Sequence, residues 1–181
     1  MDNGASSYRR FLDGDKDAFD GVMQALFHPL VFFIHRFVQD IHTAEDLAMD
    51  AFSDLIVHRH RYNFQVSLKT YLFTIGRSRA LDYIKHQKVL AFTELSEADT
   101  ADMQDLEERL LADQRKRMVH HAIEKLPEDM QIAIHLYYFE DLSYVQIGKV
   151  MKKNRKQVDN LLYRAKKELG IILGKDGEQL I

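Results

Sequence analysis

Two helix-start signals that lie only eleven residues apart are the strongest constraint that this sequence places on its fold. Ser143 with Gln146, and then Asn154 with Gln157, have the spacing of a capping box, in which the two side chains bond backbone N–H groups at the helix start. Only residues 152–153 separate the first helix from the second, so the helices cannot pack antiparallel. We therefore expect them to cross steeply, as in a helix-turn-helix.

The chemistry of the second of these helices favours a nucleic-acid partner. Gly148 lets the two backbones approach, and the angle between the helices is expected to be filled by Ile147, Val150 and Val158. The outward face keeps polar and basic side chains, namely Arg155, Lys156, Gln157, Asn160, Arg164 and Lys167. Arg, Lys, Gln and Asn can pair with base edges, and Lys and Arg also neutralise phosphates. Residues 149–167 hold eight basic side chains and one acidic one, which indicates a polyanionic partner, although a solvated basic face has the same composition.

Apolar residues recur at helical spacing through the first half of the chain. The pattern predicts one helix over residues 15–39, in which Pro29 is expected to cause a kink or a break. A second helix is expected from Thr43, as its N-cap, to about Arg61, and Ser67 is expected to cap a third, long helix. Three helices would then make up the first domain.

An acidic stretch without apolar periodicity divides the chain. Residues 89–114 carry one basic and eight acidic side chains, which is typical of a linker. We expect a first domain over residues 1–90, a flexible acidic linker over 91–112 and a second domain over 113–181. Helical periodicity returns around Leu106, Leu110, Met118, Ala122 and Ile123 and is expected to end at Leu126, after which Pro127 opens the next helix. No alternating strand pattern occurs, so the predicted fold class is all-α, with two small helical domains.

The motifs in both halves resemble those of bacterial sigma factors of the extracytoplasmic-function group, within the sigma-70 family. The stretch Leu126–Leu169 resembles the promoter-upstream-element domain of that family, and Ala44–Phe52 resembles its polymerase-binding helix. Residues 67–72 and 77–84 resemble its promoter-melting helix. The resemblance covers about residues 8 to 170 in the right order. The family usually has Gln where this chain has Met49, Trp where it has Ile56 and Tyr71, and Gly where it has Lys152.

The resemblance implies a dissociable, non-enzymatic initiation subunit that binds core RNA polymerase and promoter DNA. A protein inhibitor, called an anti-sigma factor, is commonly associated with such proteins. The residues expected to bind core polymerase are Asp46, Leu47, Asp50, Phe52 and Asp54. Those expected at the minus-10 promoter element are Asn63, Phe64, Lys69, Tyr71, Arg77, Arg79 and Lys85. The minus-35 element is expected to contact Arg155, Lys156, Gln157, Asn160, Arg164 and Lys167.

Residue chemistry is compatible with these roles. Asp46, Asp50 and Asp54 fall at i, i+4 and i+8 on one helix face, where they form an acidic ridge that could meet a basic partner. Aromatic and basic side chains alternate after Ser67, as in proteins that bind single-stranded DNA. One or two of the three rings of Tyr71, Phe73 and Tyr83 are expected to pack inward.

Other functions are weighed against this interpretation. A stand-alone helix-turn-helix regulator with an N-terminal dimerising or effector domain is the main alternative, and a scaffold that sequesters another regulator is a third. No glycine-rich phosphate loop, nucleophile elbow or H-E-x-x-H pattern is present, so we expect no enzyme, cofactor or metal. Without cysteines, a signal sequence or an unbroken apolar run of about 20 residues, we expect a cytoplasmic protein with no membrane insertion, associated with the nucleoid when bound to polymerase.

Overall fold

The computed structural model describes residues 4–91 and 114–174, all of whose regular elements are helical. The chain divides into two compact units, Met1–Ala101 and Asp102–Ile181. The predicted fold class, all-α with two helical domains, is therefore confirmed. The expected linker lies outside the described residues, except for Ala91, which belongs to a helix. Leu106 and Leu110 also lie outside the described residues. Each unit is described by itself below.

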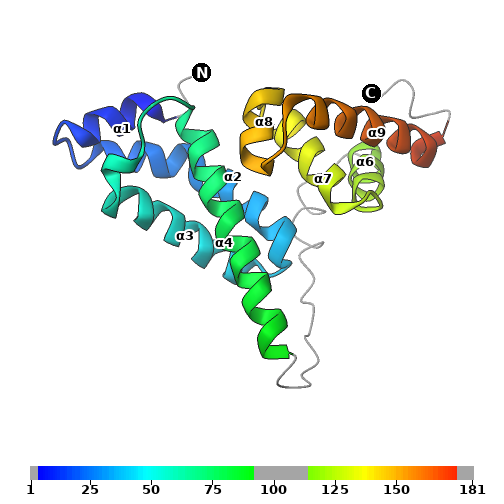
Figure 1. Ribbon diagram of the computed structural model, residues 1–181, viewed down its shortest axis with the longest axis horizontal. Coiled ribbons are helices and arrows are strands. Elements are labelled where there is room, and N and C mark those ends of the chain that lie inside the picture. The colour runs from blue at the N-terminus through cyan, green and yellow to red at the C-terminus, as the bar shows by residue number, and fades with distance from the viewer. Residues whose placement is uncertain (1–3, 92–113, 175–181) are drawn as a thin grey trace. The chain divides into compact units, whose positions relative to one another are not determined.

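The first unit is a helical bundle arranged around one apolar helix (Figure 1). Its elements in chain order are α1 (Ala5–Leu12), α2 (Ala18–Val38), α3 (Ile41–Val57), the 3-10 turn η1 (Arg59–Arg61) and α4 (Leu68–Ala91). Helix α2 packs against α1, α3 and α4, and α3 also packs against α4. The fully buried side chains include Phe33 of α2, Phe52 of α3 and Phe73 of α4. Because α3 and α4 each bury one face, their remaining faces are available to partners.

Helix α2 has two properties that the sequence left open. The helix continues through Pro29, so the proline does not end it. Among the described helices, α2 also has the length and apolar composition of a membrane span. Core helices of soluble proteins can have the same length and composition, and nine of the residues in α2 are buried within the unit. We therefore assign α2 as the core helix of this bundle.

The first unit differs from the predictions in three places. The described part of the first unit contains four α-helices rather than three, because α1 was not recognised: Tyr8 is the one buried residue of this short helix. The second predicted helix begins earlier, since the carboxylate of Asp40 accepts the N–H of Thr43 at 2.7 Å and serves as the N-cap. That helix ends at Val57, and η1 follows as a separate turn. The predicted cap of α4 is confirmed, because the Thr70 N–H donates to Ser67 Oγ at 3.1 Å.

The second unit is a set of short helices packed on its last one. It comprises α6 (Gln114–Glu124), α7 (Glu128–Ile134), the π turn η2 (His135–Phe139), α8 (Tyr144–Met151) and α9 (Arg155–Leu173). Helices α6, α7 and α8 each pack against α9. Pro127 precedes α7 as its N-cap, one position before the expected one. Both predicted capping boxes are confirmed, with the Gln146 and Gln157 side chains accepting the cap N–H groups at 2.8 Å.

A wide turn at the end of α7 changes which residues are buried. Within η2 the Glu140 N–H reaches the carbonyl of His135, five residues earlier, at 3.2 Å. This turn buries His135 beside Glu140, with 3.2 Å between Nε2 and Oε1. Tyr138, which a regular helix would place on the same face as the buried Ile134, is 48% exposed. The extra residue in the π turn shifts the following side chains around the helix axis, which a regular helical pattern does not anticipate.

The helix-turn-helix depends on one close backbone approach. Helix α8 ends at Met151, and Lys152 adopts a left-handed conformation with φ of 55° before the cap of α9. The Lys153 N–H donates to the carbonyl of Gly148 at 2.8 Å. A Cβ atom on Gly148 would lie 2.5 Å from the carbonyl oxygen of Lys153, so this position requires glycine. Ile147, Val150 and Val158 are buried in the angle, as predicted.

We expect Gly148→Ala to destabilise the second unit by about 1–3 kcal/mol, because the added methyl group meets backbone that cannot move without opening the turn. Gly170→Ala is the matched control: it lies within α9, and a Cβ there has no neighbour within 4 Å. The control is expected to be neutral or to stabilise the helix by up to about 1 kcal/mol. Urea unfolding of the full chain, followed by circular dichroism, measures both. Equal stability of the two variants would contradict this account of the turn.

Candidate functional site

The outward face of α3 combines acidic and apolar side chains. Asp46 is exposed and is in no ion pair within the described part of the chain. Met49, Ile56 and Val57 are 49%, 42% and 71% exposed, and helical spacing places them beside the acidic ridge. The sequence analysis predicted the acidic part of this face but not its apolar part. A purely solvated face would not gather three large apolar side chains, so the mixture is typical of a protein-binding surface.

Phe52 and Leu47 are less available than predicted. Phe52 is 1% exposed, and its ring centroid lies 6.2 Å from that of Phe19 and 6.0 Å from that of Phe27. The expected contact between Phe52 and the polymerase is therefore wrong for this conformation, because the side chain belongs to the core. Leu47 is half-buried. Phe52 can still act indirectly, since its packing fixes which side of α3 faces outward.

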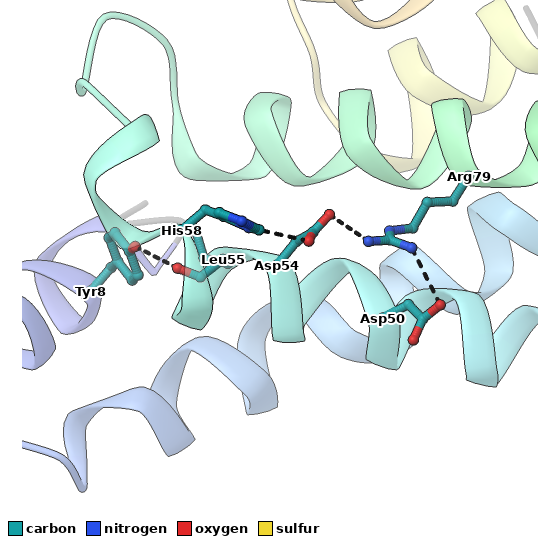
Figure 2. Close-up of polar contacts among 6 residues, drawn as sticks. All are labelled: Tyr8, Asp50, Asp54, Leu55, His58 and Arg79. Carbon is teal, nitrogen blue, oxygen red and sulfur yellow. Dashed lines mark hydrogen bonds and ion pairs between the residues drawn. The ribbon is translucent and has the colours of Figure 1, made fainter.

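Arg79 links the acidic ridge of α3 to helix α4 (Figure 2). Its guanidinium binds the carboxylate of Asp50 at 3.3 Å and also the carboxylate of Asp54. His58 Nδ1 lies 3.4 Å from the same Asp54 carboxylate. The bond from Arg79 is the largest cause of the lowered pKa of Asp54. Arg79 was predicted to contact DNA, but here it is held by two acids that were predicted to contact the polymerase.

The loop before α4 is built from aromatic rings. The Tyr62 and Phe64 centroids are 4.6 Å apart, and those of Tyr62 and Tyr71 are 5.1 Å apart. Phe64 has a left-handed backbone with φ of 59°, which is rare for a bulky residue and marks a constrained loop. Asn63 is exposed, and its side-chain oxygen accepts the Gln65 N–H at 3.2 Å. Tyr62 thus packs against both Phe64 of the predicted pair and Tyr71.

Helix α4 separates its aromatic residues into core and surface. Phe73 is fully buried, whereas Tyr71 and Tyr83 are half-buried, which agrees with the expectation that one or two rings pack inward. The Lys69 ammonium lies 5.7 Å from the centroid of the Phe73 ring. Lys85 is exposed and Arg77 is half-buried. Unlike Arg79, Arg77 is in no ion pair in the described ranges, so its charge remains available to an anion.

The outward face of α9 is centred on four side chains. Lys156, Asn160, Tyr163 and Lys167 follow one another at steps of four, three and four residues, opposite the buried stripe that contains Val158. Tyr163 is 71% exposed and lies between Asn160 and Lys167 on this face, although the sequence analysis did not select it. Its spacing from the selected residues was the signal that could have found it. The face can offer hydrogen bonds, positive charge and an aromatic ring to DNA.

Three further polar residues are restricted by contacts within the second unit. The Gln157 Oε1 atom accepts the Asn154 N–H, so in this conformation one of the two lone pairs of that oxygen is already used. Lys153 pairs with Asp129 at 2.9 Å. The Lys166 ammonium lies 5.5 Å from the Tyr138 ring centroid, and hydrogen bonding to Tyr138 raises its pKa. Arg155 and Arg164, by contrast, are exposed as predicted.

Comparisons with known proteins agree for both units. Residues 22–89 match the family described as sigma-70 region 2, and residues 116–169 match sigma-70 region 4. The chain is 31% identical over 168 residues to the RNA polymerase sigma-H factor of Pseudomonas aeruginosa, covering 86% of each protein. It is 24% identical to the ECF RNA polymerase sigma factor SigM of Bacillus subtilis, covering 83% of this chain and 91% of the relative.

Two solved structures have a similar fold. The sigma factor RpoE of Bartonella quintana, solved in complex with the anti-sigma factor NepR, superimposes with a TM-score of 0.68 at 18% identity, covering 87% of this chain and 98% of that one. CnrH, solved in complex with the cytosolic domain of CnrY, has a TM-score of 0.67 at 16% identity, covering 96% and 97%. Within the described residues, no cluster of three or more His, Asp or Glu side chains is placed to hold a metal ion.

We expect Arg79→Gln to make the stability of the first unit less dependent on pH. Because the pKa of Asp54 is lowered in the folded state, its ion pair stabilises the protein above the unfolded-state pKa of about 3.9 and is lost as the pH falls through the folded value. The parent protein should therefore lose more unfolding free energy on acidification than Arg79→Gln does. Lys16→Gln, which removes an exposed charge outside this network, is the control. Urea unfolding at neutral and acidic pH measures the difference, and parallel pH profiles for all three proteins would argue against the pairing.

Proposed function

We propose roles for three surfaces of this chain on the premise that it belongs to the sigma-70 family, as an alternative sigma factor of the extracytoplasmic-function group that directs promoter-specific transcription. It is not an enzyme: members of this family bind core RNA polymerase and promoter DNA. The observation that carries this conclusion is the match of region 2 to the first unit and of region 4 to the second, in chain order. The alternative of a stand-alone helix-turn-helix regulator is not favoured, because such a protein has no reason to carry region 2.

The first proposed role is core-polymerase binding by the outward face of α3. Asp46 and Asp50 supply negative charge there, and Met49 and Ile56 supply apolar area beside it. A partner helix with basic and apolar side chains would complement both properties. Leu47 and Asp54 border this face, and Phe52 supports it from the core. This assignment keeps the predicted helix but changes which of its residues touch the partner.

The second proposed role is recognition of the minus-10 element by the loop before α4 and by α4 itself. Asn63 and Phe64 lie in the loop, Tyr62 packs against both Phe64 and Tyr71, and positive charge along the helix comes from Lys69, Arg77 and Lys85. Rings for stacking and cations for phosphates are the combination that single-stranded DNA requires. Arg79 contributes to this surface only if its bonds to Asp50 and Asp54 open.

The third proposed role is recognition of the minus-35 element by α9. The helix start enters the major groove in a helix-turn-helix, which places Lys156 and Asn160 nearest the bases. Lys167 and Arg164, further along, are positioned for phosphates, and Tyr163 lies between the two sets. Arg155 and Gln157 flank the base-facing side chains. Of the two amide side chains, Asn160 is exposed, whereas the Gln157 oxygen already accepts one hydrogen bond in the helix cap.

Two further aspects are proposed from the family. Sigma factors are cytoplasmic proteins that act with RNA polymerase, and we propose that this one associates with the nucleoid when bound to the polymerase. We also propose that a protein inhibitor controls it, because a solved structure with this fold is a complex with an anti-sigma factor. Transcription in vitro with core polymerase, across a library of genomic fragments, tests the function as a whole. Initiation at no fragment above the level of core polymerase alone would overturn it.

We expect Asp46→Lys to weaken association with core polymerase by about tenfold or more, because the new charge repels a basic partner surface. Asp46 is preferred to Asp50 as the test position because replacing Asp50 would also release Arg79. Asp20→Lys, an exposed acid on α2, is the charge-matched control and should bind normally. Competition against a labelled parent protein measures the affinity. Full affinity of a folded Asp46→Lys protein would remove α3 from the interface.

We expect Asn160→Ala and Lys167→Ala to have different effects at the minus-35 element. Loss of a base contact at Asn160 should cost about 1–3 kcal/mol on the preferred sequence and relax discrimination at one base pair. Loss of a phosphate contact at Lys167 should weaken all sequences alike and reduce the salt slope by about one unit. Lys125→Ala, an exposed cation outside α9, is the control. Transcription from promoter variants measures both effects, and unchanged base preference in Asn160→Ala would assign sequence reading to another residue.

A further inference from the structure

Helix α1 is attached to the loop before α4 through one buried tyrosine. Tyr8 is fully buried, and its hydroxyl donates to the carbonyl of Leu55 at 3.0 Å, as Figure 2 shows, and lies 3.4 Å from the carbonyl of Arg59. Its ring centroid is 5.6 Å from that of Tyr62 and 6.4 Å from that of Phe64. These contacts hold α1, the η1 turn and the loop together, although they are far apart in sequence.

Three arginines are brought to this junction from separate segments. Arg9 comes from α1, whereas Arg59 and Arg61 come from η1, and all three are exposed. The Arg9 guanidinium carbon lies 4.9 Å from the centroid of the Phe64 ring, so this charge sits directly at the loop. We call Arg9, Arg59 and Arg61 the loop arginines. Sequence analysis assigned none of them to a site.

The loop arginines have no counter-ion in the described part of the chain. No ion pair involves any of the three, and the aromatic rings at this junction belong to Phe64, which has no charge, and to tyrosines whose hydroxyls remain neutral. Burial raises the pKa of Tyr8 to about 12 and also raises those of Tyr62 and Tyr71, so these hydroxyls supply no negative charge at physiological pH. The carboxylate of Asp54 is already bound by Arg79 and His58. Three uncompensated cations around one constrained loop are an electrostatic site for an anion.

We propose that the loop arginines bind the phosphodiester backbone of single-stranded promoter DNA as it passes the Asn63–Phe64 loop. The inference rests on the proposed role of this loop at the minus-10 element and extends it to α1 and η1. Single-stranded DNA is bound by cations that follow its backbone and by rings that stack on its bases. Here the Arg9 cation lies against the Phe64 ring, and Tyr62 packs against both Phe64 and Tyr71, so cations and aromatic rings occur together at one loop, as that mode of binding requires.

An acidic protein segment is the other anion that such a surface could attract. The aromatic rings favour DNA, because stacking needs flat groups next to the charges, whereas an acidic peptide needs only the charges. DNA probes distinguish the two anions. A backbone site for single-stranded DNA affects a probe that is single-stranded at the minus-10 element and leaves upstream duplex binding unchanged.

The test uses the holoenzyme, formed from the full chain and core polymerase, and a promoter selected by the transcription assay above. One fluorescent probe is duplex through the minus-35 element and single-stranded from the minus-10 element onward, and a second is the upstream duplex alone. Affinity is measured by anisotropy from about 50 to 200 mM salt, the range over which counter-ion release is resolved. The variants are the triple Arg→Gln and the triple Arg→Lys changes at residues 9, 59 and 61, with Lys16→Gln as the single-charge control.

The triple Arg→Gln variant is expected to flatten the salt slope on the forked probe by about two units, since each contact to a single strand contributes about 0.7. Over a fourfold change in salt, the parent should therefore lose roughly 20-fold more affinity than the variant. Triple Arg→Lys should keep most of the slope, because phosphates respond to charge. Lys16→Gln should behave as the parent, and the upstream duplex should not distinguish any of the proteins.

Several results would overturn the proposal. An unchanged slope in triple Arg→Gln would assign the loop arginines to a protein partner or to solvent. An equal loss on the upstream duplex would show a general charge effect. If the triple Arg→Lys variant lost as much of the salt slope as the triple Arg→Gln variant, the important interaction would be stacking of the guanidinium on Phe64 rather than phosphate binding. If the parent holoenzyme itself initiated at no promoter, the proposed function would fail first, and this outcome is distinct from a working parent with silent variants.

Discussion

Burial of α2 against α3 and α4 is the constraint on which the first unit depends. Phe33 of α2 lies at the centre, with ring centroids 4.8 Å apart between Phe33 and Phe73, and Phe52 fills the neighbouring part of the core. Apolar area removed from water stabilises by about 25 cal/mol per Å², so these rings outweigh any exposed ion pair. Because one face of α3 and one face of α4 are committed to α2, the opposite faces are the ones that can meet polymerase and DNA.

Arg79 shows how the two outward faces are related. It extends from α4 to Asp50 and Asp54 on α3, so a side chain of the proposed DNA surface is bound to side chains of the proposed polymerase surface. The pair is partly exposed, and its contribution to stability is accordingly modest. The ion pairs also couple the two faces, because a partner that binds Asp50 or Asp54 changes the environment of Arg79. The two surfaces of the first unit are therefore adjacent and share charged groups.

The second unit depends on contacts between residues that are close in sequence. Its helix-turn-helix needs two helices to cross within a connection of three residues, 152–154, and both capping boxes lie at the start of their helices. Gly148 permits the contact with the carbonyl of Lys153, and Lys152 accepts a left-handed backbone where glycine would be easier. The apolar stripe of α9 then determines that Lys156, Asn160, Tyr163 and Lys167 face outward. The orientation of α9 thus follows from packing between residues that are close in sequence.

The sequence alone determined the features that depend on near neighbours. The caps at Ser67, Ser143 and Asn154, the short turn between α8 and α9 and the all-helical class were predictable because each rests on residues three or four positions apart. Tertiary structure decided the rest. It placed Phe52 in the core, paired Arg79 with acids 25 and 29 residues away, and attached α1 to a loop more than 50 residues later through Tyr8. Periodicity identifies which face of a helix is buried, but it does not specify which distant side chain lies opposite a given charge, because that depends on how the helices pack together.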